Sequence, residues 1–249
     1  MLRVEHLSYD VLEDGKQSEL LRDISFSVED GEMLVITGPN GGGKSTLAKV
    51  LMGINKETSG KIYLNDQEIT GMTIDERAIA GMGFAFQQPP RFKGMTVRRL
   101  LSLAAGTELS EEKCCELLSS VGLCAREYID READATLSGG EMKRIEIATV
   151  MAKKHDICIF DEPEAGIDLW SFSMLIQRFE QMHREKKESL ILISHQEKII
   201  QMADRIMVIA DGKMKTIGST QEVMPQLFGE DVQSCFCSEK KGGVLYEVK

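Results

Sequence analysis

A segment of nine residues near the N-terminus constrains this chain more than any other feature. Residues 38–46 read GPNGGGKST and match the phosphate-binding pattern G-x-x-x-x-G-K-[ST]. The apolar run at 33–36 predicts a buried strand before the segment, and the run at 47–52 predicts a helix after it. Because this strand–loop–helix order is the context that the pattern requires, the segment indicates a nucleotide-phosphate site rather than an ordinary glycine-rich turn.

The residue types of this segment suit the binding of a phosphate chain. Glycines let the backbone curl so that its N–H groups point inward, and the start of the following helix adds a partial positive charge. Lys44 is predicted to contact the β- and γ-phosphates, and the Ser45 hydroxyl is predicted to hold Mg²⁺. The residues expected to bind the nucleotide here are Gly38, Asn40, Gly41, Gly43, Lys44, Ser45 and Thr46.

Length, composition and charge narrow the class of protein. The chain has 249 residues, of which 42% are hydrophobic and 28% charged, as is typical of one large or two small globular domains. Its net charge of −10 argues against nucleic acid or an anionic membrane as the main partner. No apolar run approaches the length of a membrane span, and the first residues lack the apolar region of a signal peptide. We therefore expect a cytoplasmic protein that binds no nucleic acid.

Two patterns of apolar residues predict two kinds of sheet. Alternating apolar residues at 2–7 and 24–28 indicate antiparallel strands, joined by a polar loop at 13–18. Three short, wholly apolar runs later in the chain indicate a buried parallel sheet. These runs lie at residues 157–160, 190–193 and 206–209.

The stretch between these two regions is rich in helix signals. Its leucines recur at helical spacing, and we expect an inserted helical subdomain at 95–135. Residues 1–94 and 136–249 would then form the catalytic core of a single domain, 1–249. The predicted fold class is α/β: a P-loop NTPase core with a mainly parallel buried sheet, an N-terminal antiparallel β part and the inserted helical subdomain.

Two acids follow the first of the later apolar runs. A buried strand that ends in Asp161 places a carboxylate at the carboxyl edge of the sheet, beside the phosphate loop. Asp161 can then hold Mg²⁺ directly or through water, and Glu162 is placed to accept a proton from an attacking water. Acids commonly follow strands, so the pair is informative only because the phosphate loop precedes it in the right order.

A second predicted anion site lies at the start of a helix. Ser138, Gly139 and Gly140 suit such a site, although one chain rarely needs two γ-phosphate sites for one nucleotide. Here the sequence resembles the ATP-binding cassette (ABC) ATPases, whose signature motif LSGGQ corresponds to LSGGE at residues 137–141. The resemblance implies ATP and Mg²⁺ as cofactors. It also implies a second copy of the chain that packs head to tail, so that each ATP lies between one phosphate loop and the other copy's signature.

The resemblance assigns roles to four residues elsewhere in the chain. Tyr9 lies where the family stacks an aromatic ring on adenine, although a half-buried strand tyrosine would fit the same position. Gln87 lies in the loop that senses Mg²⁺ and the nucleophilic water; Gln88 could replace it, but Gln87 directly follows the predicted strand. Asp168 belongs to the loop that contacts the partner chain. His195 resembles the switch histidine that contacts the γ-phosphate.

The remaining polar features have ordinary interpretations. The basic pairs at 143–144 and 153–154 are expected on solvated helix faces. Cys235 and Cys237 could bind a soft metal, but two ligands do not make a site, so we assign them no role.

Local features make SufC, the soluble ATPase of iron–sulfur cluster assembly, the expected member of the family. The basic pair at 143–144 follows SGGE as in SufC proteins, and FAFQQP at 84–89 resembles their FAFQYP stretch. Glu164 stands where SufC chains often have Asp. Residues 91–95 depart from SufC, and the segment 87–138 is shorter than in many SufC chains. Those departures bear on the partner more than on the chemistry, because these positions line the surface on which the family docks its partner.

The expected partner is therefore a soluble SufB-like scaffold that docks near Gln87. Phe92, in the proline-stiffened segment 89–94, would serve as an apolar anchor unless its ring packs into its own subdomain. Two alternatives stay open. The chain could be the ATPase subunit of an ABC membrane transporter, whose partner is a permease. It could also be a nucleotide-binding switch that no longer hydrolyses ATP, although the intact Glu162 and His195 argue against that.

Overall fold

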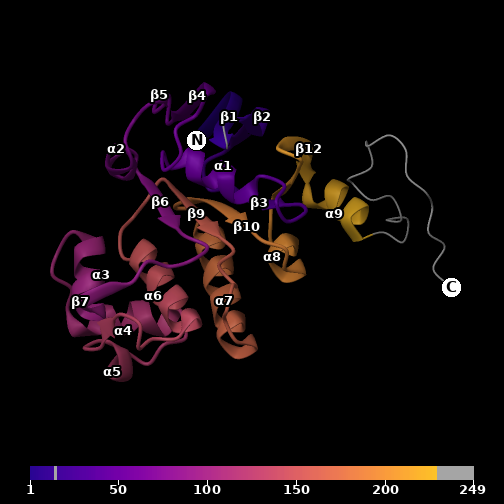
Figure 1. The fold of residues 1–249 in the computed structure, drawn as a ribbon. Helices are drawn as coiled ribbons and strands as arrows, with labels where there is room; N and C mark the ends of the chain where they lie inside the picture. The colour runs from indigo at the N-terminus through magenta and orange to yellow at the C-terminus, as the bar shows by residue number, and fades with distance from the viewer. Residues whose placement is uncertain (14–15, 229–249) are drawn as a thin grey trace.

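The computed structural model describes residues 1–13 and 16–228, so Cys235 and Cys237 lie outside the described residues. Its centre is a six-stranded sheet in the order β12-β11-β3-β10-β9-β6 (Figure 1). The strands from β11 to β6 are parallel to their neighbours, and β12 pairs antiparallel at one edge, which confirms the predicted mainly parallel sheet. These strands are β3 (Met33–Thr37), β6 (Met82–Ala85), β9 (Ile157–Asp161), β10 (Ser189–Ile193), β11 (Arg205–Ala210) and β12 (Lys213–Ser219).

The two faces of this sheet pack into two separate apolar cores. In β3, Leu34 and Ile36 belong to the core shared with α1, whereas Met33 and Val35 belong to the core shared with α6 and α7. Successive side chains of a strand point to opposite faces, so a strand covered on both sides must be apolar throughout. The helices around the sheet are α1 (Lys44–Leu51), α2 (Ile74–Ile79), α6 (Gly139–Met151), α7 (Leu169–Glu185), α8 (Glu197–Gln201) and α9 (Thr220–Phe228).

A four-stranded antiparallel sheet in the order β2-β1-β4-β5 covers α1 and confirms the predicted N-terminal β part. The polar loop predicted at 13–18 is wrong, because β1 continues to Glu13 and β2 begins at Lys16. Near the tip, Leu12 is 79% exposed and pairs with Gln17, so the hairpin extends beyond the core. Strand pairing uses backbone groups, and polar side chains in solvent do not prevent it. The four strands are β1 (Leu2–Glu13), β2 (Lys16–Val28), β4 (Ser59–Leu64) and β5 (Gln67–Glu68).

Three helices occupy most of the segment between β6 and α6, where the helical subdomain is predicted. Figure 1 shows them together, apart from the antiparallel sheet. A two-stranded ribbon joins the two ends of this segment, because β7 pairs with β8. These elements are β7 (Phe92–Thr96), α3 (Val97–Ala105), α4 (Glu111–Ser120), α5 (Ala125–Tyr128) and β8 (Glu132–Ala133). Among the described residues, no helix is both long enough and apolar enough to span a membrane.

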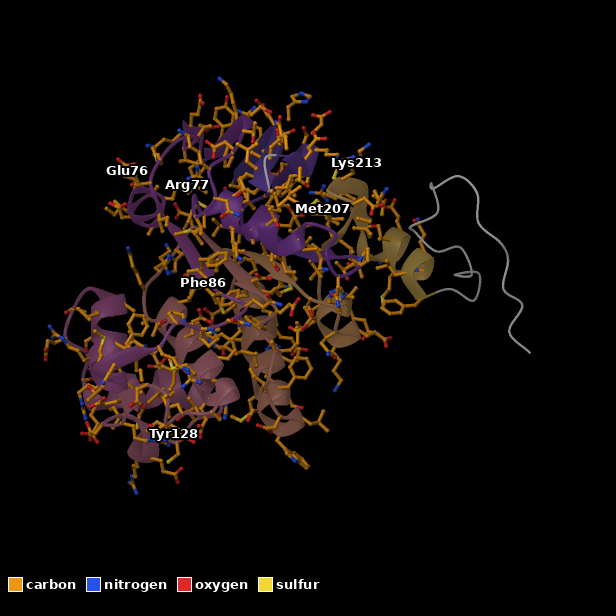
Figure 2. All side chains as sticks on the ribbon, in the orientation of Figure 1. Glu76, Arg77, Phe86, Tyr128, Met207 and Lys213 are labelled. Atoms are coloured by element: carbon orange, nitrogen blue, oxygen red, sulfur yellow. The ribbon has the colours of Figure 1, made fainter. Side chains whose placement is uncertain are left out.

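One buried arginine holds the helix that carries the phosphate loop. Arg77 of α2, labelled in Figure 2, is 1% exposed and donates from Nη1 to the carbonyl oxygens of Val50 and Leu51, each at 2.7 Å. Its Nη2 lies 3.5 Å from the carboxylate of Glu57, which is also buried. Arg77 therefore supplies a side-chain donor to carbonyl groups at the end of α1, of which that of Val50 also accepts from the Gly53 N–H at 3.0 Å.

We expect Arg77→Met to lower the free energy of unfolding by about 3 kcal/mol, because it leaves the buried Glu57 carboxylate without its cationic partner and the Leu51 carbonyl without its side-chain donor. Urea unfolding of the purified protein measures this loss. Arg126→Met, at an exposed position, is the control and should have almost no effect. A loss below about 1 kcal/mol for Arg77→Met would mean that water replaces the arginine at the end of α1.

Candidate functional site

The phosphate loop lies at the carboxyl edge of the main sheet, where β3 ends and α1 begins. Gly38 has a φ of 131°, and a Cβ built on it would lie 2.1 Å from the carbonyl oxygen of Ile209, so only glycine fits there. Gly43, with a φ of 107°, is the N-cap of α1. The N–H groups in the first turn of α1 have no acceptor within the helix, which is the arrangement that binds phosphate.

A cavity of about 230 Å³ opens at this edge of the sheet. It brings together the phosphate loop, the residue that follows β6 by two positions and the residue that follows β9. Three segments that the sequence singles out separately thus meet at one place. The lining residues are Asn40, Gly41, Gly43, Lys44, Ser45, Thr46, Gln87 and Glu162.

Lys44 is held in the phosphate loop by the loop's own backbone. Its ammonium group donates to the carbonyl oxygens of Gly38 at 2.8 Å and Pro39 at 2.9 Å, and the residue is 5% exposed. Burial lowers the pKa of Lys44, while the nearby carboxylates of Glu162 and Asp161 act in the opposite direction. The positive charge is therefore oriented before any nucleotide binds.

Asp161 and Ser45 form a pair of oxygen ligands suited to a divalent cation. The Ser45 hydroxyl donates to Oδ1 of Asp161 at 2.9 Å. Asp161 is fully buried, and its Oδ2 has no hydrogen-bond partner among the described residues. Burial raises the pKa of Asp161, with the Ser45 hydrogen bond opposing it. A buried carboxylate oxygen without a partner next to a hydroxyl fits Mg²⁺, a hard cation that prefers oxygen ligands.

Gln87 and Glu162 contact each other inside the cavity. Nε2 of Gln87 donates to Oε2 of Glu162 at 2.8 Å. Glu162 has a φ of 44°, and its N–H donates to the Ile193 carbonyl at 3.0 Å. A left-handed backbone is unfavourable for a residue with a side chain and is typical of functional sites. Gln88 does not line the cavity, so of the two glutamines Gln87 is the one positioned to act there.

His195 follows β10 and keeps contact with solvent. Partial burial lowers the pKa of its ring, the positive charge of Lys44 lowers it further, and Glu162 opposes both. A pKa below the ordinary value keeps the imidazole neutral at pH 7, so one ring nitrogen can donate and the other accept. His195 does not line the cavity in this structure, and its contact with the γ-phosphate stays a prediction.

Glu164 is a residue of this region whose role sequence reasoning missed. The hydroxyl of fully buried Ser194 donates to Oε1 of Glu164 at 2.6 Å. Because Ser194 precedes His195 and Glu164 follows Glu162 by two positions, this bond joins the loops that carry both predicted catalytic residues. Burial raises the pKa of Glu164, and the bond from Ser194 opposes the shift. The unusual acid in the sequence was the available signal, but its partner could not be read from the sequence.

The signature residues lie at the start of α6 and do not line the cavity. Ser138 is the N-cap: its Oγ accepts from the Glu141 N–H at 3.2 Å, and Glu141 accepts from the Ser138 N–H at 2.7 Å. Ser138 and Gly139 are exposed, with open space beside the Gly139 Cα. A Cβ on Gly140 would lie 2.4 Å from the carbonyl oxygen of Gly166, so the loop that contains Asp168 packs directly on the signature.

Two predicted site residues have other contacts in the structure. Tyr9 of β1 is half-buried against the core of the antiparallel sheet and does not line the cavity. Asp168 is the N-cap of α7, and its Oδ1 accepts from the N–H groups of Trp170 and Ser171 at 3.0 Å each. Adenine stacking by Tyr9 and partner contact by Asp168 both stay predictions.

One prediction about α6 is wrong. Lys143 is fully buried and Arg144 is 8% exposed, so this basic pair does not lie on a solvated face. The cause is the surroundings of α6, which packs against the sheet and against α3 and α4. Arg144 donates to the carbonyl oxygen of Gly122 at 2.7 Å across that contact. The second pair, at 153–154, is exposed as predicted.

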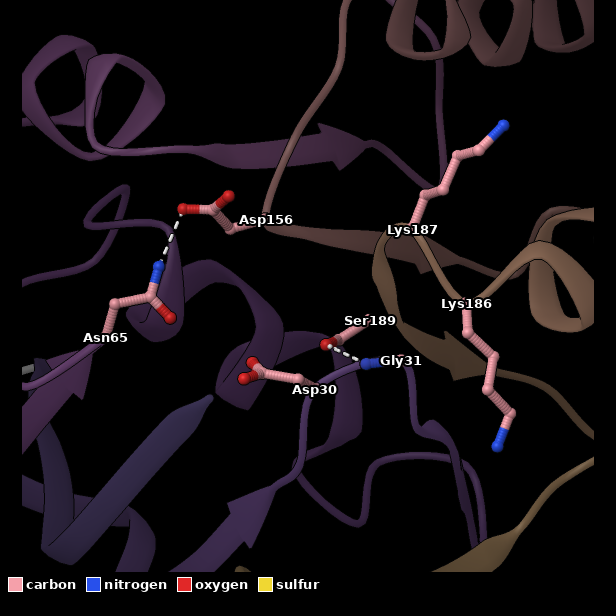
Figure 3. A pocket seen from close by; sticks show the side chains of 7 residues that line it. All are labelled: Asp30, Gly31, Asn65, Asp156, Lys186, Lys187 and Ser189. Carbon is pink, nitrogen blue, oxygen red and sulfur yellow. Dashed lines mark hydrogen bonds between the residues drawn. The ribbon is translucent and has the colours of Figure 1, made fainter.

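A second, polar pocket of about 340 Å³ lies at the opposite edge of the main sheet, where β9 and β10 begin (Figure 3). Asn65 donates to Asp156 at 2.7 Å, and the Gly31 N–H donates to Ser189 at 3.1 Å. These four polar groups are therefore already paired by hydrogen bonds. The residues that line this polar pocket are Asp30, Gly31, Asn65, Asp156, Lys186, Lys187 and Ser189. We therefore place the functional site at the carboxyl edge.

The fold and the cavity define a P-loop nucleotide hydrolase. Residues 21–165, more than half of the chain, match the ABC transporter family, and the chain belongs to that family. It is thus an ABC ATPase, as predicted, with ATP and Mg²⁺ as its ligands.

Several known proteins are similar to this chain. One is the "uncharacterized ABC transporter ATP-binding protein MJ0035" of Methanocaldococcus jannaschii, 39% identical over 88% of this chain and 90% of that protein. Another is the energy-coupling factor transporter ATP-binding protein EcfA2 of Caldanaerobacter subterraneus, 33% identical over 89% of this chain and 80% of that protein. Neither name points to SufC, so the predicted subfamily gains no support from them.

Solved structures agree with the fold. The cassette cbiO1 from Clostridium perfringens, part of the ABC transporter complex cbiONQ, matches with a TM-score of 0.72 and 27% identity over 91% of both chains. The dimeric cassette MJ0796 matches with a TM-score of 0.81 over 88% of this chain and 99% of that one, and at 22% identity it supports the fold alone.

Proposed function

We propose that this chain is the ATP-hydrolysing subunit of an ABC transporter and drives a partner protein that docks beside Gln87. The observation that carries the catalytic part is the hydrogen bond between Gln87 and Glu162 in the cavity lined by the phosphate loop. Lys44 and the loop N–H groups would bind the phosphates, and Ser45 with Asp161 would hold Mg²⁺. The metal would neutralise the phosphate charge that develops during hydrolysis.

The water that attacks the γ-phosphate must lose a proton. Glu162 is the carboxylate in the cavity that can accept it, and Gln87 fixes its orientation through the bond to Oε2. His195, neutral at pH 7, can hydrogen-bond the γ-phosphate from the end of the neighbouring strand. These roles distinguish hydrolysis from a switch that only binds ATP.

The signature supports a second copy of the chain as partner. Ser138 and Gly139 are exposed and lie outside the cavity of their own chain. A capped helix start that is open to solvent can bind the γ-phosphate held by another copy. In the proposed assembly, two ATP molecules therefore lie between two chains.

We expect the Glu162→Gln variant to be a monomer without nucleotide and a dimer with Mg-ATP, because slow turnover preserves the ATP that joins the two chains. Light scattering measures the mass in both states. Adding Ser138→Arg, which places bulk and charge on the exposed cap, should abolish the ATP-dependent dimer and leave ATP binding intact. A monomeric mass at ATP concentrations well above the Kd would contradict the proposed assembly.

An apolar groove beside Gln87 supports a docked partner. This groove, of about 420 Å³, lies between the end of β6 and the helices α3 and α6. Phe92 is half-buried there and packs against the core, so its ring is partly engaged by its own chain. A partner seated in the groove would touch the segment that leads into Gln87. Its apolar lining includes Phe84, Phe86, Pro90, Phe92, Met95, Leu100 and Leu103.

The names of the similar proteins favour a membrane permease as that partner. They are ATP-binding proteins of energy-coupling factor transporters and of sulfate/thiosulfate and molybdate/tungstate importers. A SufC-like role with a soluble SufB-like scaffold is the second candidate. The basic pair at 143–144, which is buried rather than solvated, and the half-buried acid Glu164 favour it, since both resemble SufC residues.

We expect Phe92→Ala to weaken capture of the native partner about tenfold, because truncation removes an aromatic contact in the groove. The captured protein is identified after purification from detergent-treated extract of the source cells. Ile79→Ala, at a position 79% exposed on α2, is the matched control. An integral membrane permease supports the first candidate, and a SufB-like protein supports the second. Equal capture by both variants contradicts docking in the groove.

A further inference from the structure

Helix α6 carries a buried ion pair one turn after the signature. Lys143 is 0% exposed and Glu146 is 6% exposed, and Nζ lies 3.5 Å from Oε2 of the acid. Burial lowers the pKa of Lys143 and raises the pKa of Glu146. Burying two charges is costly, and a pair of this kind is often no more stable than apolar residues of the same size. Its presence therefore calls for an explanation other than stability.

The pair holds the backbone at two separate places. The ammonium group of Lys143 donates to the carbonyl oxygen of Phe86 and, at 3.0 Å, to that of Asp161. Oε1 of Glu146 accepts from the N–H of Phe86 at 2.8 Å. Both polar groups of the Phe86 backbone are thus bound by α6. In Figure 2, Phe86 lies between the strands of the core and the helical region.

The two residues whose backbone the pair binds each precede a residue that lines the cavity. Phe86 precedes Gln87, and Asp161 precedes Glu162. A shift of the backbone at either place would move the side chain that follows. Nε2 of Gln87 lies 2.8 Å from Oε2 of Glu162, so this hydrogen bond depends on a fixed backbone at both Phe86 and Asp161.

We infer that Lys143 and Glu146 are positioning residues that set Gln87 against Glu162 for hydrolysis. The inference rests on the roles proposed above for those two residues. Glu146 and Phe86 also line the groove, so a docked partner would bear directly on the pair. Helix α6 would in this way connect three sites: the signature at its start, the cavity beside β9 and the groove.

The main test is a double variant that removes the donors without leaving a buried lone charge. In Lys143→Met with Glu146→Gln, the glutamine can still accept from the Phe86 N–H, but two carbonyl oxygens lose their donor. We expect kcat for ATP hydrolysis to fall about 10- to 100-fold, while KM and ATP affinity stay within about threefold. Lys153→Met, at an exposed site, is the matched control and should stay within about threefold of wild type.

Turnover, affinity for a fluorescent ATP analogue and the unfolding midpoint are measured on the same samples. If the double variant does not fold, Lys143→Gln combined with Glu146→Gln, which keeps a shorter donor and leaves no buried charge, is tested in the same way. Because the pair acts through Gln87, adding Gln87→Ala to the double variant should lower kcat by less than the product of the two separate fold-losses in kcat. The inference is overturned if the losses in kcat multiply in full when Gln87→Ala is added, or if kcat of the double variant stays within about threefold of wild type. It is also overturned if the double variant loses ATP affinity in step with kcat. Unchanged turnover in Gln87→Ala and Glu162→Gln would instead overturn the roles on which it rests.

Discussion

A Glu162→Gln variant is expected to bind Mg-ATP with wild-type affinity and to hydrolyse it at least about 100-fold more slowly. Glutamine has the shape of glutamate, and its amide oxygen can accept the 2.8 Å bond from Gln87. The backbone strain at φ 44° is unchanged by the substitution. The proton acceptor alone is removed, since an amide does not take a proton from water at neutral pH. Steady-state hydrolysis and equilibrium ATP binding, measured on one preparation, separate the two effects.

The control for this prediction is Glu180→Gln, an equally conservative change at an exposed position on α7. It should leave both measurements unchanged. A hydrolysis rate for Glu162→Gln within about threefold of wild type would place the base elsewhere in the cavity. A loss of ATP affinity in step with the rate would instead mean that Glu162 contributes to binding rather than to proton transfer.

The chemistry of the site could be predicted because short stretches of sequence determine it. Gly38 is required by a backbone that leaves no room for a Cβ, and that requirement is visible in the motif. Asp161 and Glu162 follow a run that is apolar because both faces of β9 are covered. The carboxyl ends of parallel strands lie at the same edge of the sheet. The proximity of Glu162 to Lys44 could therefore be predicted from the strand assignments alone.

The contacts around α6 could not be predicted, because they depend on what packs on every side of the helix. Lys143 and Arg144 suit a solvated face by residue type alone, yet the sheet, α3 and α4 leave no such face. The bond from Ser194 to Glu164 likewise joins residues 30 positions apart, and neither forms part of a motif. Polar residues that act through buried bonds are therefore the ones that sequence patterns miss.

The partner could not be predicted for a different reason. Residues that bind ATP and activate water are required by the reaction, whichever partner protein ATP hydrolysis drives. The groove that contains Phe92 is apolar and suits either a permease or a soluble scaffold. Of the features shared with SufC, Phe84 and Phe86 line the groove, whereas Glu164 does not, and apolar rings of this kind suit either partner.

A Lys44→Ala variant is expected to bind Mg-ATP about 10- to 100-fold more weakly and to show no measurable turnover. The ammonium group is already placed in the loop by the carbonyl oxygens of Gly38 and Pro39, at 2.8 and 2.9 Å. Binding a phosphate chain therefore requires little reorientation of the charge. Within the described residues lining the cavity, Lys44 is the one cationic side chain, so no neighbour can replace it.

Lys56→Ala, which removes an exposed lysine outside the cavity, is the matched control for charge. Titration with ATP and with ADP distinguishes the contacts that are lost. If Lys44 contacts the γ-phosphate, the substitution should weaken ATP binding more than ADP binding; equal losses would restrict its contact to the phosphates that both nucleotides share. Because the N–H groups at the start of α1 remain, some nucleotide binding should persist in the variant. Unchanged ATP affinity together with unchanged turnover would show that the loop backbone is sufficient and that Lys44 has no part in the reaction.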